Sequence, residues 1–156
     1  MGIGGILEGV AGNALWNWLT SVCRHLFNRI AISSPRPNEV LIGDPVTNGQ
    51  KAYSISGTLK RLPEGHAVWL LVEDAATGKV WPQLREAVGH DSIRKVWHGK
   101  VTASPGPIRI YAVVAPPTTQ DLFRYYKEHG SVTHWAPLKR IPPECQNRAF
   151  VQAKGA

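Results

Sequence analysis

The sequence predicts a mainly β fold: an antiparallel two-sheet sandwich with an apolar helix at the N-terminus and a short helix near residues 118–129. Alternating apolar and polar stretches recur about every ten residues after residue 38. Turn sequences separate them, and the chain holds 12 prolines and 15 glycines. Before residue 33 the period is helical instead. We therefore expect two parts, an N-terminal helix over residues 1–33 and a sandwich domain over residues 34–156.

Alternation predicts where the strands lie and which side of each is buried. The expected strands cover residues 52–59, 67–73, 79–83, 95–101, 108–115 and 148–153. The inward side of the first should carry Tyr53, Ile55, Gly57 and Leu59, and that of the fifth Ile108, Ile110, Ala112 and Val114. Residues 67–73 are apolar on both sides, which predicts a central strand. The last strand is expected to close a sheet edge, and Trp69 and Trp97 are expected to pack within the sheets.

A short helix is expected after Pro116 and Pro117 interrupt the fifth strand. Thr118 or Thr119 is predicted to cap its N-terminus, and Gly130 to supply a left-handed C-terminal cap. Its apolar side chains are expected to pack inward: Leu122, Phe123, Tyr125 and Tyr126.

The N-terminal helix has three functional interpretations. Residues 3–22 are long enough for a membrane span of about 20 residues, but Glu8 would be costly near the bilayer centre. An interfacial helix would anchor through Trp16 and Trp18 and place Arg24 and Arg29 on anionic lipid. A self-associating helix would pack closely through Gly5, Gly9, Asn13 and Ala14. Simple docking on the sandwich is the fourth, non-functional alternative.

The chain is basic, with a formal charge of +7, which suits an anionic partner such as nucleic acid, phosphate or anionic lipid. Residues 122–156 hold six Lys or Arg against two Glu. We predict a ligand or anion face formed by Trp81, Arg124, Lys127, Trp135, Lys139 and Arg140, with Arg148 as a further cation. A merely solvated helix face is the alternative for these charges.

No sequence pattern indicates catalysis, a metal or a cofactor. The six histidines include no H-x-x-x-H pair, and no C-x-x-C, phosphate-binding glycine loop or nucleophile elbow is present. His90 and Asp91 are the nearest approach to a catalytic dyad, and they fall in a turn sequence. We therefore expect a protein that is not an enzyme and that needs no cofactor.

Cysteine usage predicts the compartment. Cys23 and Cys145 are far apart in the sequence, which favours a reducing cytosol over a disulfide framework. The start of the chain lacks the basic n-region of a signal peptide. We expect a cytoplasmic location, with the inner face of the membrane as the alternative. If the helix spans, Arg24 and Arg29 favour a cytoplasmic sandwich.

Five motifs over residues 38–115 carry a resemblance: Ile55-Ser56-Gly57-Thr58-Leu59, Leu62-Pro63, Val68-Trp69-Leu70-Leu71-Val72, Trp81-Pro82-Gln83 and Trp97-His98-Gly99-Lys100-Val101. They resemble small bacterial immunoglobulin-like modules, which often follow transmembrane or signalling segments in uncharacterised or defence-related proteins. The resemblance implies an immunoglobulin-like sandwich. It implies no catalytic residue, and such sandwiches serve unrelated functions.

These observations lead to a main hypothesis and two alternatives. The main one is a non-enzymatic, membrane-associated or self-assembling accessory or effector protein, whose sandwich docks a partner while the N-terminal helix contacts membrane or other copies. A homo-oligomer is expected, with membrane lipid, a protein or a phosphate-bearing ligand as further partners and no metal. The first alternative is a soluble module that binds a protein or an anionic ligand such as a nucleotide. The second is a carbohydrate-binding module that uses Trp81 and Trp135.

Overall fold

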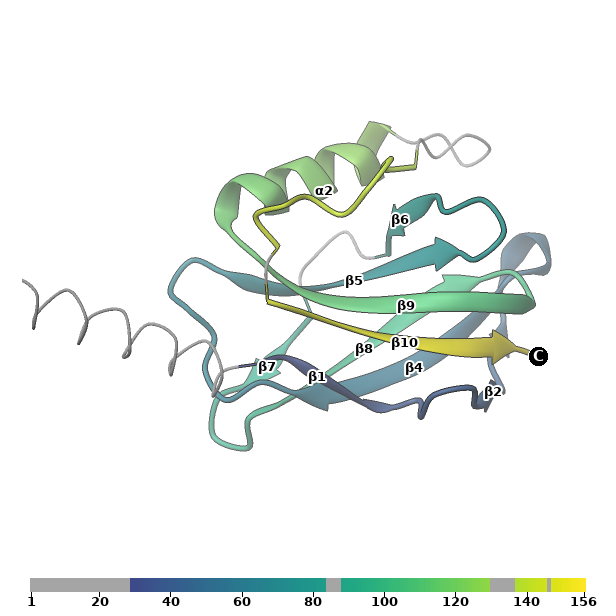
Figure 1. Cartoon of the computed structure of the whole chain (residues 1–156), viewed down its shortest axis with the longest axis horizontal. Coiled ribbons are helices and arrows are strands. Elements are labelled where there is room, and N and C mark those ends of the chain that lie inside the picture. The colour runs from purple at the N-terminus through teal and green to yellow at the C-terminus, as the bar shows by residue number, and fades with distance from the viewer. Residues whose placement is uncertain (1–28, 84–87, 130–136, 146) are drawn as a thin grey trace, which may run out of the picture.

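Figure 1 shows a computed structural model of the protein, in which residues 29–83, 88–129, 137–145 and 147–156 are described. This part of the chain is mainly β and contains ten strands, one 3-10 turn and one α-helix. In chain order they are β1 (Ala31–Ser34), β2 (Val40–Leu41), β3 (Asp44–Pro45), η1 (Thr47–Gly49), β4 (Lys51–Thr58), β5 (Ala67–Asp74), β6 (Val80–Pro82), β7 (His90–Asp91), β8 (Val96–Ala103), β9 (Gly106–Ala115), α2 (Pro117–His129) and β10 (Arg148–Gly155).

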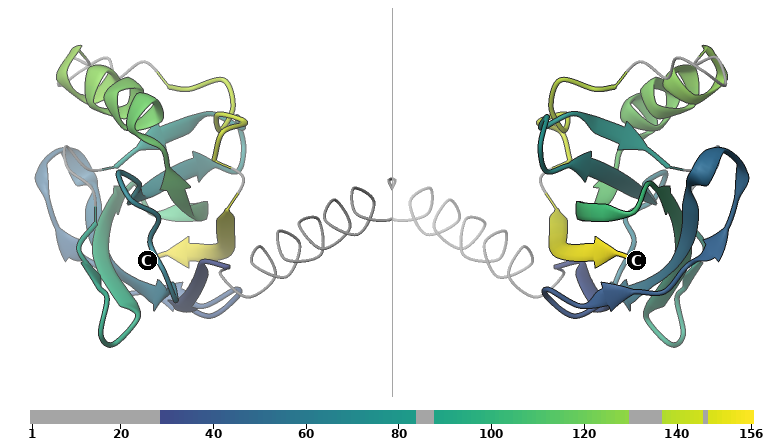
Figure 2. Two further views of the ribbon diagram at one scale, coloured as in Figure 1. Left: turned by 90° about the vertical axis from the view of Figure 1, so that its left-hand side faces the viewer. Right: turned by 90° about the vertical axis from the view of Figure 1, so that its right-hand side faces the viewer.

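The strands form two sheets that pack face to face. The first sheet has the order β1-β4-β8-β7, with β3 also paired to β4, and the second has the order β2-β10-β9-β5-β6. Every pair is antiparallel except β2 with β10, which is parallel. Figure 2 shows the two layers from the side, with α2 outside the second sheet. The structure thus confirms a mainly β, two-sheet architecture.

The inner core lies between the sheets and follows the predicted alternation. Tyr53 and Ile55 of β4, and Leu59 directly after it, are at most 1% exposed, and they belong to one cluster with Ile108, Ile110, Ala112 and Val114 of β9. Trp97 is fully buried in the same cluster. Gly57 also faces inward, and a Cβ there would collide with the Trp97 ring and the Ala31 carbonyl. The predicted orientation of these two strands is therefore confirmed.

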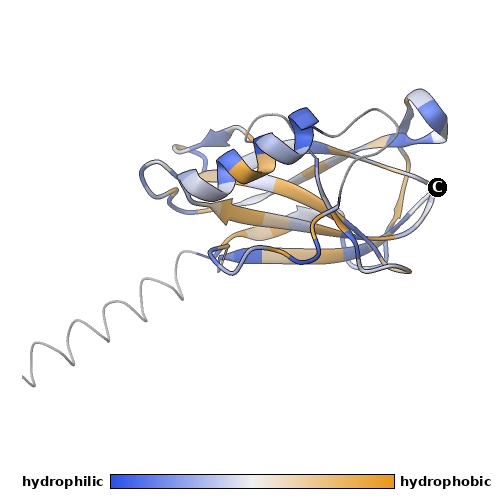
Figure 3. Cartoon of the chain, turned by 90° about the horizontal axis from the view of Figure 1, so that it is seen from above, coloured by the Kyte–Doolittle hydropathy of each residue, from blue (hydrophilic) through white to orange (hydrophobic). Residues whose placement is uncertain are grey.

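A second core, the outer core, lies on the opposite face of the second sheet beneath α2. It contains the buried residues Trp69, Leu71, Val80, Val113, Ala115, Phe123, Leu138 and Cys145. Because β5 lies between β9 and β6 and contributes to both cores, its apolar character on both faces is explained, and the prediction of a central strand is confirmed. Figure 3 views α2 from above, with strands below it coloured as hydrophobic.

Helix α2 confirms the predicted helix near residues 118–129 but corrects its details. It begins at Pro117, and the Pro116 carbonyl accepts hydrogen bonds from the Thr119 and Gln120 N–H groups, so both threonines lie inside the helix and neither is the N-cap. Only one face is covered by the sheet. Phe123 is fully buried, whereas Leu122 is 38% and Tyr125 57% exposed, so these two do not pack inward. Gly130 lies outside the described residues.

The sheet edges also differ from the prediction. Strand β10 is not an edge, because β2 pairs with its far side and leaves β10 between β2 and β9. The sequence did not predict β1, β2, β3 or β7, which have only two to four residues each. Residues 31–33 belong to β1 in the first sheet rather than to the N-terminal helix. Residues 1–28, which carry the rest of that predicted helix, lie outside the described residues.

Candidate functional site

The outer face of the second sheet changes from apolar to polar along β5. Trp69 and Leu71 are buried under α2 and the segment that follows it, and Glu73 is the next residue on the same side. Cross-strand pairing places Arg109 of β9 beside Glu73, and Phe150 of β10 beside Tyr111 of β9. The part of this face beyond α2 is therefore built from charged and aromatic side chains.

An open hollow, here called the outer hollow, lies over this part of the sheet. It has a volume of about 650 Å³, and its walls come from the β5–β6 hairpin, β9, β10 and the segment after α2. It is lined by Glu73, Gly78, Val80, Tyr111, Lys139, Arg140, Ile141, Pro143, Arg148 and Phe150. This volume lies within the range of pockets that hold small molecules, about 300–1,000 Å³.

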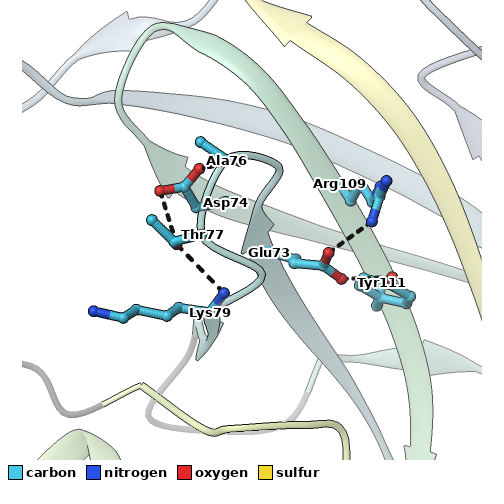
Figure 4. A network of polar contacts seen from close by, with 7 residues as sticks. All are labelled: Glu73, Asp74, Ala76, Thr77, Lys79, Arg109 and Tyr111. Carbon is cyan, nitrogen blue, oxygen red and sulfur yellow. Dashed lines mark hydrogen bonds and ion pairs between the residues drawn. The ribbon is translucent and has the colours of Figure 1, made fainter.

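A hydrogen-bonded network fixes the carboxylate of Glu73 at one wall of the hollow (Figure 4). The Arg109 Nη1 group donates to Glu73 Oε1 at 2.8 Å, and the Tyr111 hydroxyl donates to Glu73 Oε2 at 2.7 Å. The Glu73 side chain is only 13% exposed. Burial raises the pKa of the Tyr111 phenol, and the hydrogen bond to Glu73 raises it further, because an ionised phenol would face the carboxylate.

The adjoining β5–β6 turn is held by local hydrogen bonds, also drawn in Figure 4. Asp74 accepts from the Ala76 N–H at 2.8 Å and from the Thr77 hydroxyl at 3.1 Å. The Ala76 hydrogen bond is the main reason that the pKa of Asp74 is lowered. Gly78 has a φ of +67°, a conformation that glycine adopts without steric cost. This turn therefore forms a fixed rim beside Glu73.

Cations and an aromatic pair complete the hollow. Lys139, Arg140 and Arg148 are exposed, and among the described residues none of the three has an ion-pair partner. Phe150 is 66% exposed, and its ring lies 5.8 Å from that of Tyr111. The one carboxylate in the lining, Glu73, is already paired with Arg109. The lining of the hollow therefore carries an excess of positive charge beside an aromatic surface.

The structure brings together only part of the predicted anion face. Lys139, Arg140 and Arg148 line the outer hollow. Arg124 on α2 instead pairs with Asp121 at 2.7 Å, and neither it nor Lys127, which also has an interaction partner, lines the hollow. Trp81 is half-buried on the opposite side of β6 from Val80, because neighbouring residues of a strand face opposite ways. Arg124 and Lys127 of α2, and Trp81 of β6, are thus not part of the lining of the hollow.

Several predicted residues lie outside the described part of the chain. They are Gly5, Gly9, Asn13, Ala14, Trp16, Trp18, Arg24 and Trp135. Arg29 is described and is exposed just before β1. The roles proposed for all of these residues stay predictions.

Sequence reasoning missed Glu73, Arg109, Tyr111 and Phe150. A signal for Glu73 was present, since it is the first polar residue on the outer side of a strand that is otherwise apolar. The other three lie on strands whose outer side had no predicted cover. The contacts of Arg109 and Tyr111 with Glu73, and of Phe150 with Tyr111, depend on the register of β5, β9 and β10, which alternation within one strand does not reveal.

His90 and Asp91 each have structural partners of their own. His90 Nε2 lies 2.7 Å from the Leu59 carbonyl oxygen, and Asp91 Oδ1 accepts from the Ile93 and Arg94 N–H groups at 2.9 Å each. Within the described ranges, no group of three or more His, Cys, Asp or Glu side chains is arranged to hold a metal ion. Over the same ranges, no helix has the length and apolar character needed to cross a membrane.

Comparison with known proteins gives no family assignment. No protein-family model matches the chain, and no curated protein matches it. Inferences about function therefore depend on the chain's own residues.

Proposed function

We propose that the sandwich is a binding module for a small anionic ligand with an aromatic ring, and that this ligand is a nucleotide. The observation that supports the proposal is the outer hollow, whose lining holds three cations without ion-pair partners in the described chain, the exposed ring of Phe150 and the partly buried ring of Tyr111. The charge of this lining supports the anionic-ligand alternative derived from the sequence.

The chemistry of the hollow matches the two ends of a nucleotide. Arginine and lysine donate charge-assisted hydrogen bonds to phosphate oxygens, and arginine can do so with two parallel N–H groups. Phe150 exposes an aromatic surface on which a base can stack, an interaction worth about 1–3 kcal/mol per base. Lys139 and Arg140 lie in the segment over the sheet and Arg148 on β10, so cations come from two sides of the hollow.

Titration of the full chain with ATP, GTP, CTP and UTP tests this proposal by calorimetry without divalent cations. Binding of at least one of them is expected, with Arg148→Ala weakening it about tenfold through loss of a phosphate contact. Lys100→Ala is the matched control, since Lys100 is an exposed cation of β8 on the outer face of the first sheet, across the sandwich from the hollow. It should leave the affinity unchanged apart from a small general charge effect.

Two outcomes contradict the proposal. If inorganic tripolyphosphate binds as tightly as the best nucleotide, the aromatic pair contributes nothing and the ligand is a simple anion. If none of the four nucleotides binds at millimolar concentration, the hollow is not a nucleotide site. Phe150→Ala distinguishes stacking from charge, because it should weaken nucleotides and leave tripolyphosphate unaffected.

We also propose that the sandwich is immunoglobulin-like, as the sequence resemblance implies. In that fold, strands A, B, E and D form one sheet and strands G, F and C the other, with a C′ strand added in some forms. The orders β1-β4-β8-β7 and β10-β9-β5-β6 support this assignment, since they follow the same sequence of strands. The helix α2 is then an insertion between the last two strands.

Membrane association or self-assembly through residues 1–28 stays a prediction, and the sandwich suggests how to test it. Ile30 is 4% exposed, and its N–H donates to Asn147 Oδ1 at 2.9 Å, so a shortened chain must keep residue 29 onward. Cell fractionation measures membrane association, and sedimentation measures oligomeric state, for both the full chain and the chain that starts at residue 29. If the full chain and the shortened one are equally soluble and monomeric, the membrane and assembly hypotheses both fail.

A further inference from the structure

The carboxylate of Glu73 has hydrogen-bonding capacity that its described partners do not use. An ionised carboxylate only accepts hydrogen bonds and has about four lone-pair sites on its two oxygens. Among the described residues, Oε1 accepts one bond, from Arg109, and Oε2 accepts one, from Tyr111. One acceptor site on each oxygen is therefore left for another donor, and Glu73 is part of the lining of the outer hollow.

Glu73 lies next to the aromatic pair and well separated from Arg148 along the strand direction. Its contact with the Tyr111 hydroxyl places it at the edge of the Tyr111–Phe150 pair. Arg148 pairs with Val113 on β9, whereas Glu73 pairs with Arg109, four residues away on the same strand. Four residues of a strand correspond to about 13 Å. A ligand that contacts both Glu73 and Arg148 is thus elongated, with donors at one end and negative charge at the other.

We propose that Glu73 selects the base and that the hollow is specific for guanine nucleotides, an inference that rests on the proposed function. Guanine presents two adjacent donors, its N1–H and its exocyclic amino group, which match the two oxygens of one carboxylate. The corresponding edges of adenine and cytosine place an acceptor nitrogen beside a single amino group. Uracil flanks its one N–H with two carbonyl oxygens. In each of these three bases an acceptor would face the carboxylate and repel it.

Arg109 and Tyr111 act as positioning residues for Glu73. Each donates to a different carboxylate oxygen, so together they fix the plane of the carboxylate across β5 and β9. The Arg109 guanidinium lies 2.8 Å from Oε1, so this oxygen is held by an ion pair as well as a hydrogen bond. The selecting group is therefore held in place before the ligand arrives.

Calorimetric titration of the full chain with GTP, ITP, ATP, CTP and UTP tests the inference. ITP keeps the N1–H of GTP but lacks its amino group. GTP should bind about 5- to 150-fold more tightly than ATP, CTP or UTP, with ITP between GTP and these three. Glu73→Gln keeps the shape of the side chain but replaces one acceptor with a donor. It should weaken GTP binding and remove the preference for GTP over the other four nucleotides, because the side chain no longer accepts from both guanine donors.

The outcomes separate this inference from the proposed function. Arg148→Ala should weaken all five nucleotides by a similar factor, because it removes a phosphate contact shared by them. Equal binding of all five by the wild type overturns guanine selection while leaving the nucleotide site in place. An unchanged GTP preference in Glu73→Gln, or ITP binding as tight as GTP, also overturns it. If Glu73→Gln does not fold, the ratio of the wild type's affinities for GTP and ITP still tests guanine selection. No binding of any nucleotide refutes both proposals.

Discussion

The outer faces of the two sheets differ, although both come from alternating strands. On the first sheet, β4 and β8 present Ser54, Ser56, His98 and Lys100 outward, and none of these side chains is buried. On the second sheet, the corresponding side of β5 and β9 carries Trp69 and other buried residues beneath α2. The outer face of the first sheet is polar and can remain in contact with solvent, whereas the apolar outer face of the second sheet must be buried by another part of the chain.

The second sheet's outer face is covered over only part of its length, and the candidate site lies over the uncovered part. Helix α2 and the segment around Leu138 protect one end of the second sheet's outer face. At the other end the side chains turn polar, and the outer hollow opens over Glu73, Tyr111 and Phe150. The same stretch of chain between β9 and β10 thus builds part of the outer core and supplies Lys139 and Arg140 to the hollow.

The largest expected effect comes from removing the outer core. Trp69 is fully buried, and its ring lies 5.3 Å from that of Phe123, so Trp69→Ala and Phe123→Ala should each reduce the free energy of unfolding by about 3–5 kcal/mol. Because the rings touch, the double variant should lose less than the sum. Lys100→Ala, on the outer face of the first sheet, should change the free energy of unfolding by less than about 0.5 kcal/mol. Urea unfolding measures all four; a loss below about 1 kcal/mol for Trp69→Ala would show that the outer core is dispensable.

The inner side of the first sheet should be intolerant of even one added methyl group. Gly57→Ala places a Cβ against the Ala31 carbonyl and the Trp97 ring, and should cost about 1–3 kcal/mol. Gly89→Ala is the control, since no atom lies within 4 Å of its Cβ position. Urea unfolding of both variants measures the difference. Equal stability of the Gly57→Ala and Gly89→Ala variants would mean that Gly57 does not approach β1 and the Trp97 ring closely.

The polar end of the second sheet should show a smaller, pH-dependent effect. Tyr111→Phe removes the hydrogen bond to Glu73 and should cost about 1 kcal/mol near pH 7. The pKa of Tyr111 is raised in the folded protein, so the stability tied to its protonated phenol is present below pH ~10 and is lost as the pH rises through the folded-state pKa. The difference between wild type and variant should therefore shrink above pH ~10. Urea unfolding from pH 7 to 11 checks this, and a constant difference would contradict the network.

The smallest effect concerns reactivity rather than stability. Cys145 is 1% exposed in the outer core, and burial raises the pKa of its thiol to about 11. In a Cys23→Ser variant, this thiol should react slowly with a disulfide reagent at pH 8 and rapidly in urea. The reaction rate reports how often the outer layer opens. A rate equal to that of a small free thiol would indicate that the cover over this face is not closed.

The inner core was predictable because burial on one side of a strand leaves a local pattern. Tyr53 and Ile55 follow this pattern in β4 and Leu59 continues it directly after the strand, while Ile108 and Ile110 follow it in β9. Helix α2 was predictable as a helix but not in its orientation, since Leu122, Phe123, Tyr125 and Tyr126 do not define one face. The sheet decides that Phe123 is the buried one.

The sequence by itself determined the alternating strands β4 and β9, the doubly buried strand β5 and a basic C-terminal third. Only the tertiary structure decided that β10 lies between β9 and β2, that α2 covers the second sheet, and that Lys139, Arg140 and Arg148 share a hollow with Phe150. The physical reason is the range of the interactions. Side-chain periodicity records the environment of each strand separately, whereas strand register and helix docking arise from contacts between residues far apart in the chain.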